Sequence, residues 1–141
     1  MDFPVIEFTS SPSLADVGRL AEGINESAVQ HGISTTAGNP FGFFIRNSEG
    51  KTVAGCNGYF VFGSLYVDQL WVDPNNQKQG YGKALMEKVH EFGREEGCSM
   101  VCLTTMSFQA EPFYRKLGYE VDFKRDGYTG GSQMIFLRKM L

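Results

Sequence analysis

The feature of the sequence that most constrains the fold is a loop with two glycines, Gly80 and Gly82, between an apolar strand and an amphipathic helix. The strand candidate ends at Val72, and apolar side chains then recur at helical spacing from Leu85 to Phe92. The first amides of a helix have no partner inside the helix, and the helix dipole favours an anion beside them. Glycine lets such an anion approach the backbone closely. The segment therefore predicts a phosphate-binding loop.

The loop does not match two common nucleotide-binding patterns. The Walker pattern continues with Lys and then Ser or Thr, whereas here Ala84 follows Lys83. The dinucleotide fingerprint requires a third glycine and a parallel strand–helix–strand unit, but the strands before this loop have the pattern of an antiparallel meander. Lys78 and Lys83 add positive charge. A tight turn that uses two glycines would explain the loop alone equally well.

Hydrophobic patterning and turn residues divide the rest of the chain into strands and helices. In chain order they predict a strand at 5–8, a helix from Ser11-Pro12 to Gln30, strands at 41–47, 51–62 and 65–72, a helix ending near Glu96, a strand at 99–105, a helix at 109–117, and strands at 119–124 and 133–138. A helix between the strands 65–72 and 99–105 implies a parallel crossover within a mostly antiparallel sheet. The predicted fold class is α/β (α+β), with a mixed central sheet of about six to seven strands flanked by helices, in one domain over residues 1–141.

A second segment accompanies the glycine loop further along the chain. Residues Ala110 to Tyr119 read A-E-P-F-Y-R-K-L-G-Y, and the loop reads Gln77-x-x-Gly80-x-Gly82. They resemble the A-x-x-x-Y-x-K-x-G-[FY] and Q/R-x-x-G-x-G/A motifs of the GCN5-related N-acetyltransferase (GNAT) family, in the family's order. The similarity covers residues 65–119. It implies a GNAT-like fold and transfer of an acetyl group from the cosubstrate acetyl-coenzyme A to an amine.

The resemblance also implies roles for single positions. Loop amides would bind the diphosphate of coenzyme A, the main chain of the preceding strand would pair with the pantetheine arm, and Tyr114 would protonate the departing thiolate. Many members carry Asn seven residues before this tyrosine, where this chain has Ser107, whose shorter side chain weakens the expected cofactor contact. The implied cofactor-binding residues are Leu70, Trp71, Val72, Gln77, Lys78, Gln79, Gly80, Tyr81, Gly82, Lys83 and Ser107. Spacing alone favours a core tyrosine with a satisfied hydroxyl at position 114, whereas the motif match favours the catalytic role.

Asp68 is the second candidate catalytic residue. It alternates with Tyr66 and Leu70 in the strand 65–72, where an ionised carboxylate is costly unless it is hydrogen-bonded or faces a cleft. An alkylammonium must lose a proton before it attacks a thioester, and a carboxylate can take that proton through a water molecule. A structural aspartate bonded to the backbone or to a tyrosine explains the position equally well. Trp71 could pack under a helix or line the acceptor pocket, and we expect it in the core. We expect His90 to be exposed among charged helix residues.

Charge and composition exclude several classes of protein. Thirteen Lys and Arg against sixteen Asp and Glu give a net charge of −3, which argues against general nucleic-acid binding. No apolar run is long enough to span a membrane. The odd number of cysteines favours reduced thiols and a cytoplasmic location. Neither His31 nor His90 lies at ligand spacing from a cysteine, so we expect no metal site.

The sequence thus predicts an enzyme that acetylates a primary amine by direct attack. A small-molecule acceptor is favoured because the loops 31–40 and 126–132 could form only a modest roof. A protein acetyltransferase acting on an N-terminus or lysine is the alternative if those loops leave an open groove. A non-catalytic acyl-coenzyme A-binding module would need the glycine loop but neither Tyr114 nor Asp68. A C-terminal strand at the sheet edge would need covering, for instance in a homodimer.

Overall fold

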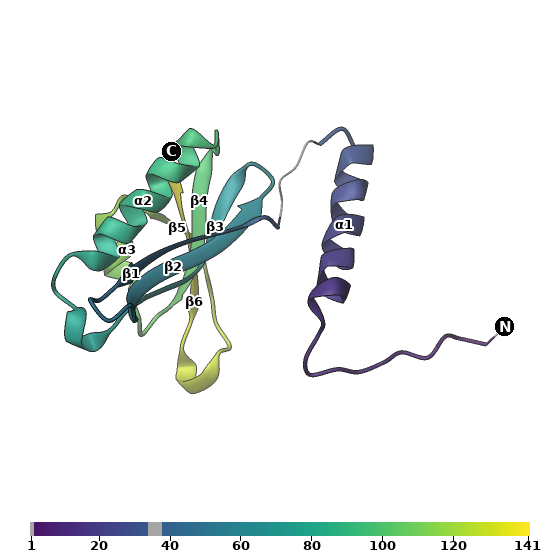
Figure 1. The fold of residues 1–141 in the computed structure, drawn as a ribbon, viewed down its shortest axis with the longest axis horizontal. Coiled ribbons are helices and arrows are strands. Elements are labelled where there is room, and N and C mark those ends of the chain that lie inside the picture. Colours follow the sequence, from purple (N-terminus) through teal and green to yellow (C-terminus); the bar gives the residue numbers. More distant parts are fainter. Residues whose placement is uncertain (1, 34–37) are drawn as a thin grey trace. The chain divides into compact units, whose positions relative to one another are not determined.

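The first 35 residues form a unit of their own in the computed structural model, which describes residues 2–33 and 38–141. An irregular segment precedes α1 (Leu14–Gln30) (Figure 1), so the strand predicted at 5–8 is wrong. A strand needs a hydrogen-bonded neighbour, and residues 5–8 have none among the described residues. The helix ends where predicted but begins later, because Ser13, and not Ser11, accepts the Asp16 amide at 3.1 Å as N-cap.

The second unit, residues 36–141, contains a six-stranded sheet in the order β1-β2-β3-β4-β6-β5 (Figure 1). Its strands are β1 (Pro40–Arg46), β2 (Thr52–Val61), β3 (Ser64–Val72), β4 (Met100–Met106), β5 (Glu120–Arg125) and β6 (Met134–Met140). Neighbours pair antiparallel except β3 and β4, which are parallel. The mixed, mostly antiparallel sheet and its single crossover are thereby confirmed.

The C-terminal strand is not an edge strand. β6 lies between β4 and β5, and the two edges of the sheet are β1 and β5. The prediction that the C-terminal strand needs a cover is therefore wrong, because β5 already pairs with it. Strand order follows long-range pairing, which local sequence patterns do not report.

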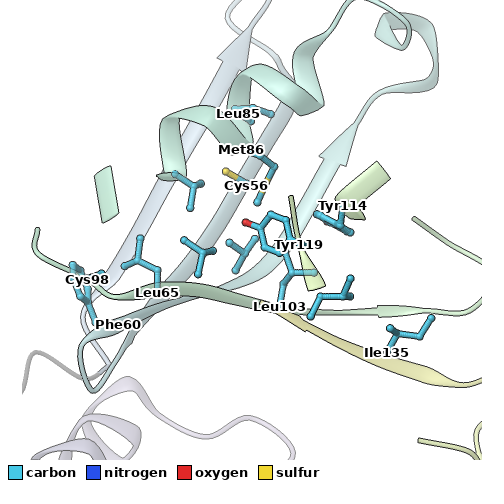
Figure 2. Close-up of a cluster of buried hydrophobic side chains, with 14 of the residues drawn as sticks. Cys56, Phe60, Leu65, Leu85, Met86, Cys98, Leu103, Tyr114, Tyr119 and Ile135 are labelled. Atoms are coloured by element: carbon cyan, nitrogen blue, oxygen red, sulfur yellow. The ribbon is translucent and has the colours of Figure 1, made fainter. Parts of the chain in front are cut away.

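The hydrophobic core lies between the sheet and α2 (Tyr81–Glu95), which packs against β1 to β4. Leu85 and Met86 extend from this helix toward the strands, and Tyr119 joins the same cluster (Figure 2). Every second residue of β4 is buried, as expected for a strand with one face on the core. Gly97, with φ 75°, ends α2 as predicted, and its amide bonds the Arg94 carbonyl at 3.1 Å.

Two short helical turns and a third helix complete the unit: η1 (Pro74–Asn76), α3 (Glu111–Lys116) and η2 (Thr129–Gly131). The turn η2 lies within the predicted loop 126–132. Of the predicted loop 31–40, residues 34–37 lie outside the described residues. None of the helices in the described ranges has the length and hydropathy needed to cross a membrane.

Candidate active site

The parallel strands β3 and β4 separate halfway along their length. They pair only over Leu65–Val67 and Val101–Leu103, after which a cavity of about 370 Å³ opens between them. Side chains of both strands and of the α3 region line it: Asp68, Gln69, Leu70, Trp71, Thr104, Thr105, Gln109, Ala110 and Tyr114. Beyond Val67, the main chain of β3 pairs with β2 on one side only within the described residues. The other side is available to an extended ligand, in the manner of strand addition.

A β-bulge lies at the point of separation. Asn57 of β2 pairs with Gln69 and Gly58 pairs with Val67, so Asp68 has no partner in β2. A Cβ at Gly58 would collide with the Tyr66 carbonyl oxygen, so this close approach of the two strands requires glycine. Sequence analysis missed Gly58, although a lone glycine inside a strand pattern is a signal for such a bulge.

The bulge leaves the side chain of Asp68 exposed at the rim of the cavity. Among the described residues it forms no hydrogen bond or ion pair, which removes the structural explanation for this carboxylate. Burial and the nearby Tyr66 and Asp68 raise the pKa of Tyr59. The Tyr59 and Tyr66 rings lie 5.4 Å apart, and the Tyr66 hydroxyl is 3.2 Å from Thr104 Oγ1.

Tyr114 lies in the wall of the same cavity with 7% of its surface exposed. Its ring stacks edge to face with Phe113 and Tyr119, at centroid distances of 5.1 and 5.6 Å. Burial, followed by the influence of Cys56, raises the pKa of Tyr114 to about 12. The phenol therefore keeps its proton at neutral pH, as a general acid requires. Its hydroxyl makes no hydrogen bond with the described residues, so the expectation of a satisfied core tyrosine does not hold.

The glycine loop leaves the first amides of α2 free. Lys78 and Gly80 have positive φ angles of 66° and 80°, and Gly80 is the N-cap of the helix without any side-chain cap. Within the described part of the chain, no acceptor bonds the amides of Tyr81 to Lys83. Gly82 serves packing, because a Cβ there would lie 3.3 Å from the Phe113 ring.

The loop borders a second cavity, of about 450 Å³, which adjoins the first. Leu70 and Ala110 line both. Most of the sequence-predicted binding residues face this second cavity: Leu70, Val72, Gln77, Lys78, Gly80, Tyr81, Gly82 and Lys83. Gln79 does not line it. Gln77 has a second role in the turn, since its Nε2 donates a hydrogen bond to the Val72 carbonyl at 3.3 Å.

Two sequence-predicted residues have unexpected positions. Ser107 lines neither cavity; its hydroxyl accepts the Gln133 amide at 2.9 Å, and Gln109 faces the cavity between the strands. Trp71 is not a core residue, because 51% of its surface is exposed. It lies on the sheet face opposite its buried-side neighbours Leu70 and Val72, as strand alternation requires.

Trp71 and Gln69 also line a third cavity, of about 350 Å³, on that face of the sheet. The ring of Phe44 forms another wall and covers Gly55, where a Cβ would come within 2.6 Å of it. Asn57 Oδ1 is buried beside this cavity without a partner among the described residues. The lining suits an apolar or aromatic group, with amides available for orientation.

His90 is buried, with 5% of its surface exposed, which corrects the expectation of an exposed side chain. Its Nε2 lies 2.7 Å from the Tyr119 hydroxyl. Burial, with Lys139 and Arg94 nearby, lowers the pKa of His90 to about 4. Neither this histidine nor any other described residue belongs to a group of His, Cys, Asp and Glu that could hold a metal ion.

Comparison with known proteins extends these findings. A family model described as Acetyltransferase (GNAT) domain matches residues 39–121. Blasticidin-S acetyltransferase of Streptomyces morookaense is 33% identical over 93 residues, which cover 65% of this chain and 68% of that protein. The crystal structure of an acetyltransferase from Bacillus cereus is 26% identical, with a TM-score of 0.75 over 96% of this chain and 98% of the other. A putative streptothricin acetyltransferase from Bacillus anthracis, solved with acetyl-coenzyme A, shares the fold at 16% identity, with a TM-score of 0.66 over 75% and 65%.

Proposed function

Since the chain belongs to the GNAT family and is an acetyl-coenzyme A-dependent acetyltransferase, we propose that it acetylates a primary amine of a small molecule by direct attack. The observation that carries the proposal is that three neighbouring cavities share lining residues. The second cavity, which we call the loop cavity, shares Leu70 and Ala110 with the first cavity between β3 and β4. The first cavity in turn shares Gln69 and Trp71 with the third, which we call the aromatic cavity because Phe44 and Trp71 line it. One extended thioester and an acceptor can therefore meet between the two strands.

The order of the cavities follows the order of groups in the two substrates. The free amides of Tyr81 to Lys83 suit the diphosphate of coenzyme A. The unpaired side of β3 at Leu70 to Val72 suits the amides of the pantetheine arm. The thioester then lies between Asp68 and Tyr114, and the body of the acceptor lies against Phe44 and Trp71.

The reaction begins with removal of a proton from the ammonium group, by Asp68 directly or through water. The neutral nitrogen attacks the thioester carbonyl carbon, and a main-chain N–H at the bulge stabilises the negative charge that develops on the carbonyl oxygen. As the carbonyl re-forms, the carbon–sulfur bond breaks and the nitrogen loses its second proton to water. Tyr114 donates its proton to the departing sulfur and regains one from solvent.

The raised pKa of Tyr114 is compatible with this role. A thiol normally has a pKa of about 8.5, well below the value of about 12 for the phenol. The burial that disfavours a phenolate also disfavours a thiolate in this cavity, and it therefore raises the pKa of the departing thiol as well. The difference between the pKa values of the phenol and the thiol thus becomes smaller as negative charge develops on sulfur. Tyr114 is thus a donor that stays protonated until the bond to sulfur breaks.

Two observations favour a small molecule over a protein as acceptor. The relative that is 33% identical is named for its action on blasticidin S. The aromatic cavity beside the bulge has the volume of a small-ligand site, at about 350 Å³. We include a cytoplasmic location in the proposal, since Cys56, Cys98 and Cys102 are all free thiols.

An acceptor screen tests the proposal. Purified protein is incubated with acetyl-coenzyme A and either small amines, such as polyamines, aminoglycosides and aminoacyl nucleosides, or peptides with a free N-terminus or lysine. Thiol release and mass spectrometry report acetylation. We expect acetylation of at least one small amine, with low turnover by Tyr114→Phe and unchanged turnover by the matched control Tyr128→Phe, which alters a phenol outside the three cavities.

Two outcomes would overturn the proposal in different ways. Acetylation of peptides alone would transfer the function to protein substrates. Tight binding of acetyl-coenzyme A without thiol release for any acceptor would favour a binding module.

A further inference from the structure

A fourth cavity, of about 350 Å³, lies beside α2 and shares Lys83 with the cavity at the glycine loop. We call it the lysine pocket. Its charged and polar lining comes from α2, the end of α3 and β6, and consists of Lys83, Glu87, His90, Arg94, Lys116 and Lys139. Four cationic side chains face one carboxylate there, in a chain whose net charge is −3. Such a local excess of positive charge favours a bound anion.

Most of these cations lack a counterion. Lys83 Nζ is 3.8 Å from Glu87 Oε1, and this exposed ion pair is the sole one that the pocket residues form within the described chain. Lys139 is half-buried, and its Nζ lies 2.6 Å from the position that a Cβ of Gly118 would occupy. Its Nζ has no acceptor among the described residues, and an anionic ligand in the pocket would supply one.

The buried floor of the pocket can donate a hydrogen bond. The Tyr119 hydroxyl, 2.7 Å from His90 Nε2, remains a phenol because burial raises its pKa, and the Nε2 atom of a neutral imidazole can accept a hydrogen bond from it. In this tautomer the His90 Nδ1 carries the ring hydrogen, and His90 is one of the residues that line the pocket. A neutral donor among cations is an arrangement suited to a phosphate oxygen.

The position of the pocket identifies the anion. Lys83 lines both the lysine pocket and the loop cavity, so the two cavities adjoin each other at this side chain. In coenzyme A a single ribose ring joins the 5′-diphosphate to a 3′-phosphate. Resting on the proposed function, we infer that the lysine pocket binds the 3′-phosphate of coenzyme A, and that the enzyme therefore prefers coenzyme A to 3′-dephospho-coenzyme A.

Titration calorimetry with both ligands tests the inference. We expect coenzyme A to bind about tenfold or more tightly than its dephospho form, since the phosphate gains charge-assisted hydrogen bonds. Lys116→Gln and Lys139→Gln should each weaken coenzyme A binding several-fold and leave dephospho-coenzyme A binding unchanged. Lys88→Gln is the matched control, because Lys88 lies on α2 outside the pocket and pairs with Glu91 at 3.3 Å. Unchanged dephospho-coenzyme A binding also reports that each variant is folded.

Inorganic phosphate separates a general phosphate site from recognition of the cosubstrate. We expect millimolar phosphate to weaken coenzyme A binding more than dephospho-coenzyme A binding, because the dephospho form competes with phosphate at the glycine loop alone. Equal affinity for the two ligands, or variants that weaken both equally, would overturn the inference and leave the proposed function intact. Absence of binding for both ligands would instead remove the proposed function.

Discussion

Acid should destabilise the second unit through the buried His90. The folded state holds this imidazole neutral, with a pKa of about 4 against a reference value of 6.5. Between these two values the unfolded chain binds a proton that the folded chain does not. The free energy of unfolding therefore decreases as the pH falls through this interval and levels off below pH 4. Each unit of difference between the two pKa values is worth about 1.4 kcal/mol, so the full loss is about 3 kcal/mol.

Urea unfolding at a series of pH values from 7.5 to about 3.5 measures this loss, with Trp71 fluorescence as the signal. His90→Gln keeps a hydrogen-bonding group beside Tyr119 but cannot titrate, so its stability should depend less on pH by about 3 kcal/mol. His31→Gln, at the exposed end of α1, is the matched control and should behave like the wild type. Parallel stability curves for wild type and His90→Gln would refute the reasoning.

Three substitutions test the reaction site. Tyr114→Phe should lower kcat by about 10²-fold or more and leave acetyl-coenzyme A binding nearly unchanged in calorimetry, whereas equal turnover at every pH would exclude the phenol from the mechanism. Gly58→Ala should cost about 2 kcal/mol or more in urea unfolding and abolish turnover, because its Cβ collides with the Tyr66 carbonyl; Gly18→Ala, which meets no atom, is its control. Asp68→Asn should lower kcat/KM at neutral pH, and kcat/KM should recover at higher pH, where the amine loses its proton without a base. A pH profile parallel to that of the wild type would exclude the carboxylate as base.

The sequence predicted nearly all strands and helices of the second unit because each has a clear local period. The alternating burial of β4 and the apolar stripe of α2 are properties of neighbouring residues. The strand at 5–8 and the edge position of the C-terminal strand were wrong because both depend on pairing with distant segments. Pattern reasoning reports which face of a segment is apolar and does not report its neighbour.

The part of the candidate site that lies in the two motif segments was predictable from the sequence. The two motif segments border two adjoining cavities that share Leu70 and Ala110, and Tyr114 lines the cavity between β3 and β4. The bulge at Asp68, the exposure of Trp71 and the burial of His90 were not predicted. The bulge depends on Gly58 of the neighbouring strand, and the burial of His90 goes with its contact to the distant Tyr119 hydroxyl. Trp71 is exposed because it lies on the sheet face opposite Leu70 and Val72.

The early end of pairing between β3 and β4 bears on the stability of the sheet, because half of β3 has no hydrogen-bonded neighbour on that side among the described residues. If the pantetheine arm pairs with β3 as proposed, the cosubstrate closes a seam that the protein alone leaves open. Ligand at a hundred times its Kd would then add about 2.7 kcal/mol to the free energy of unfolding. On the same proposal, each departure of coenzyme A would open this seam again, so that product release and local loosening of the sheet would be one event.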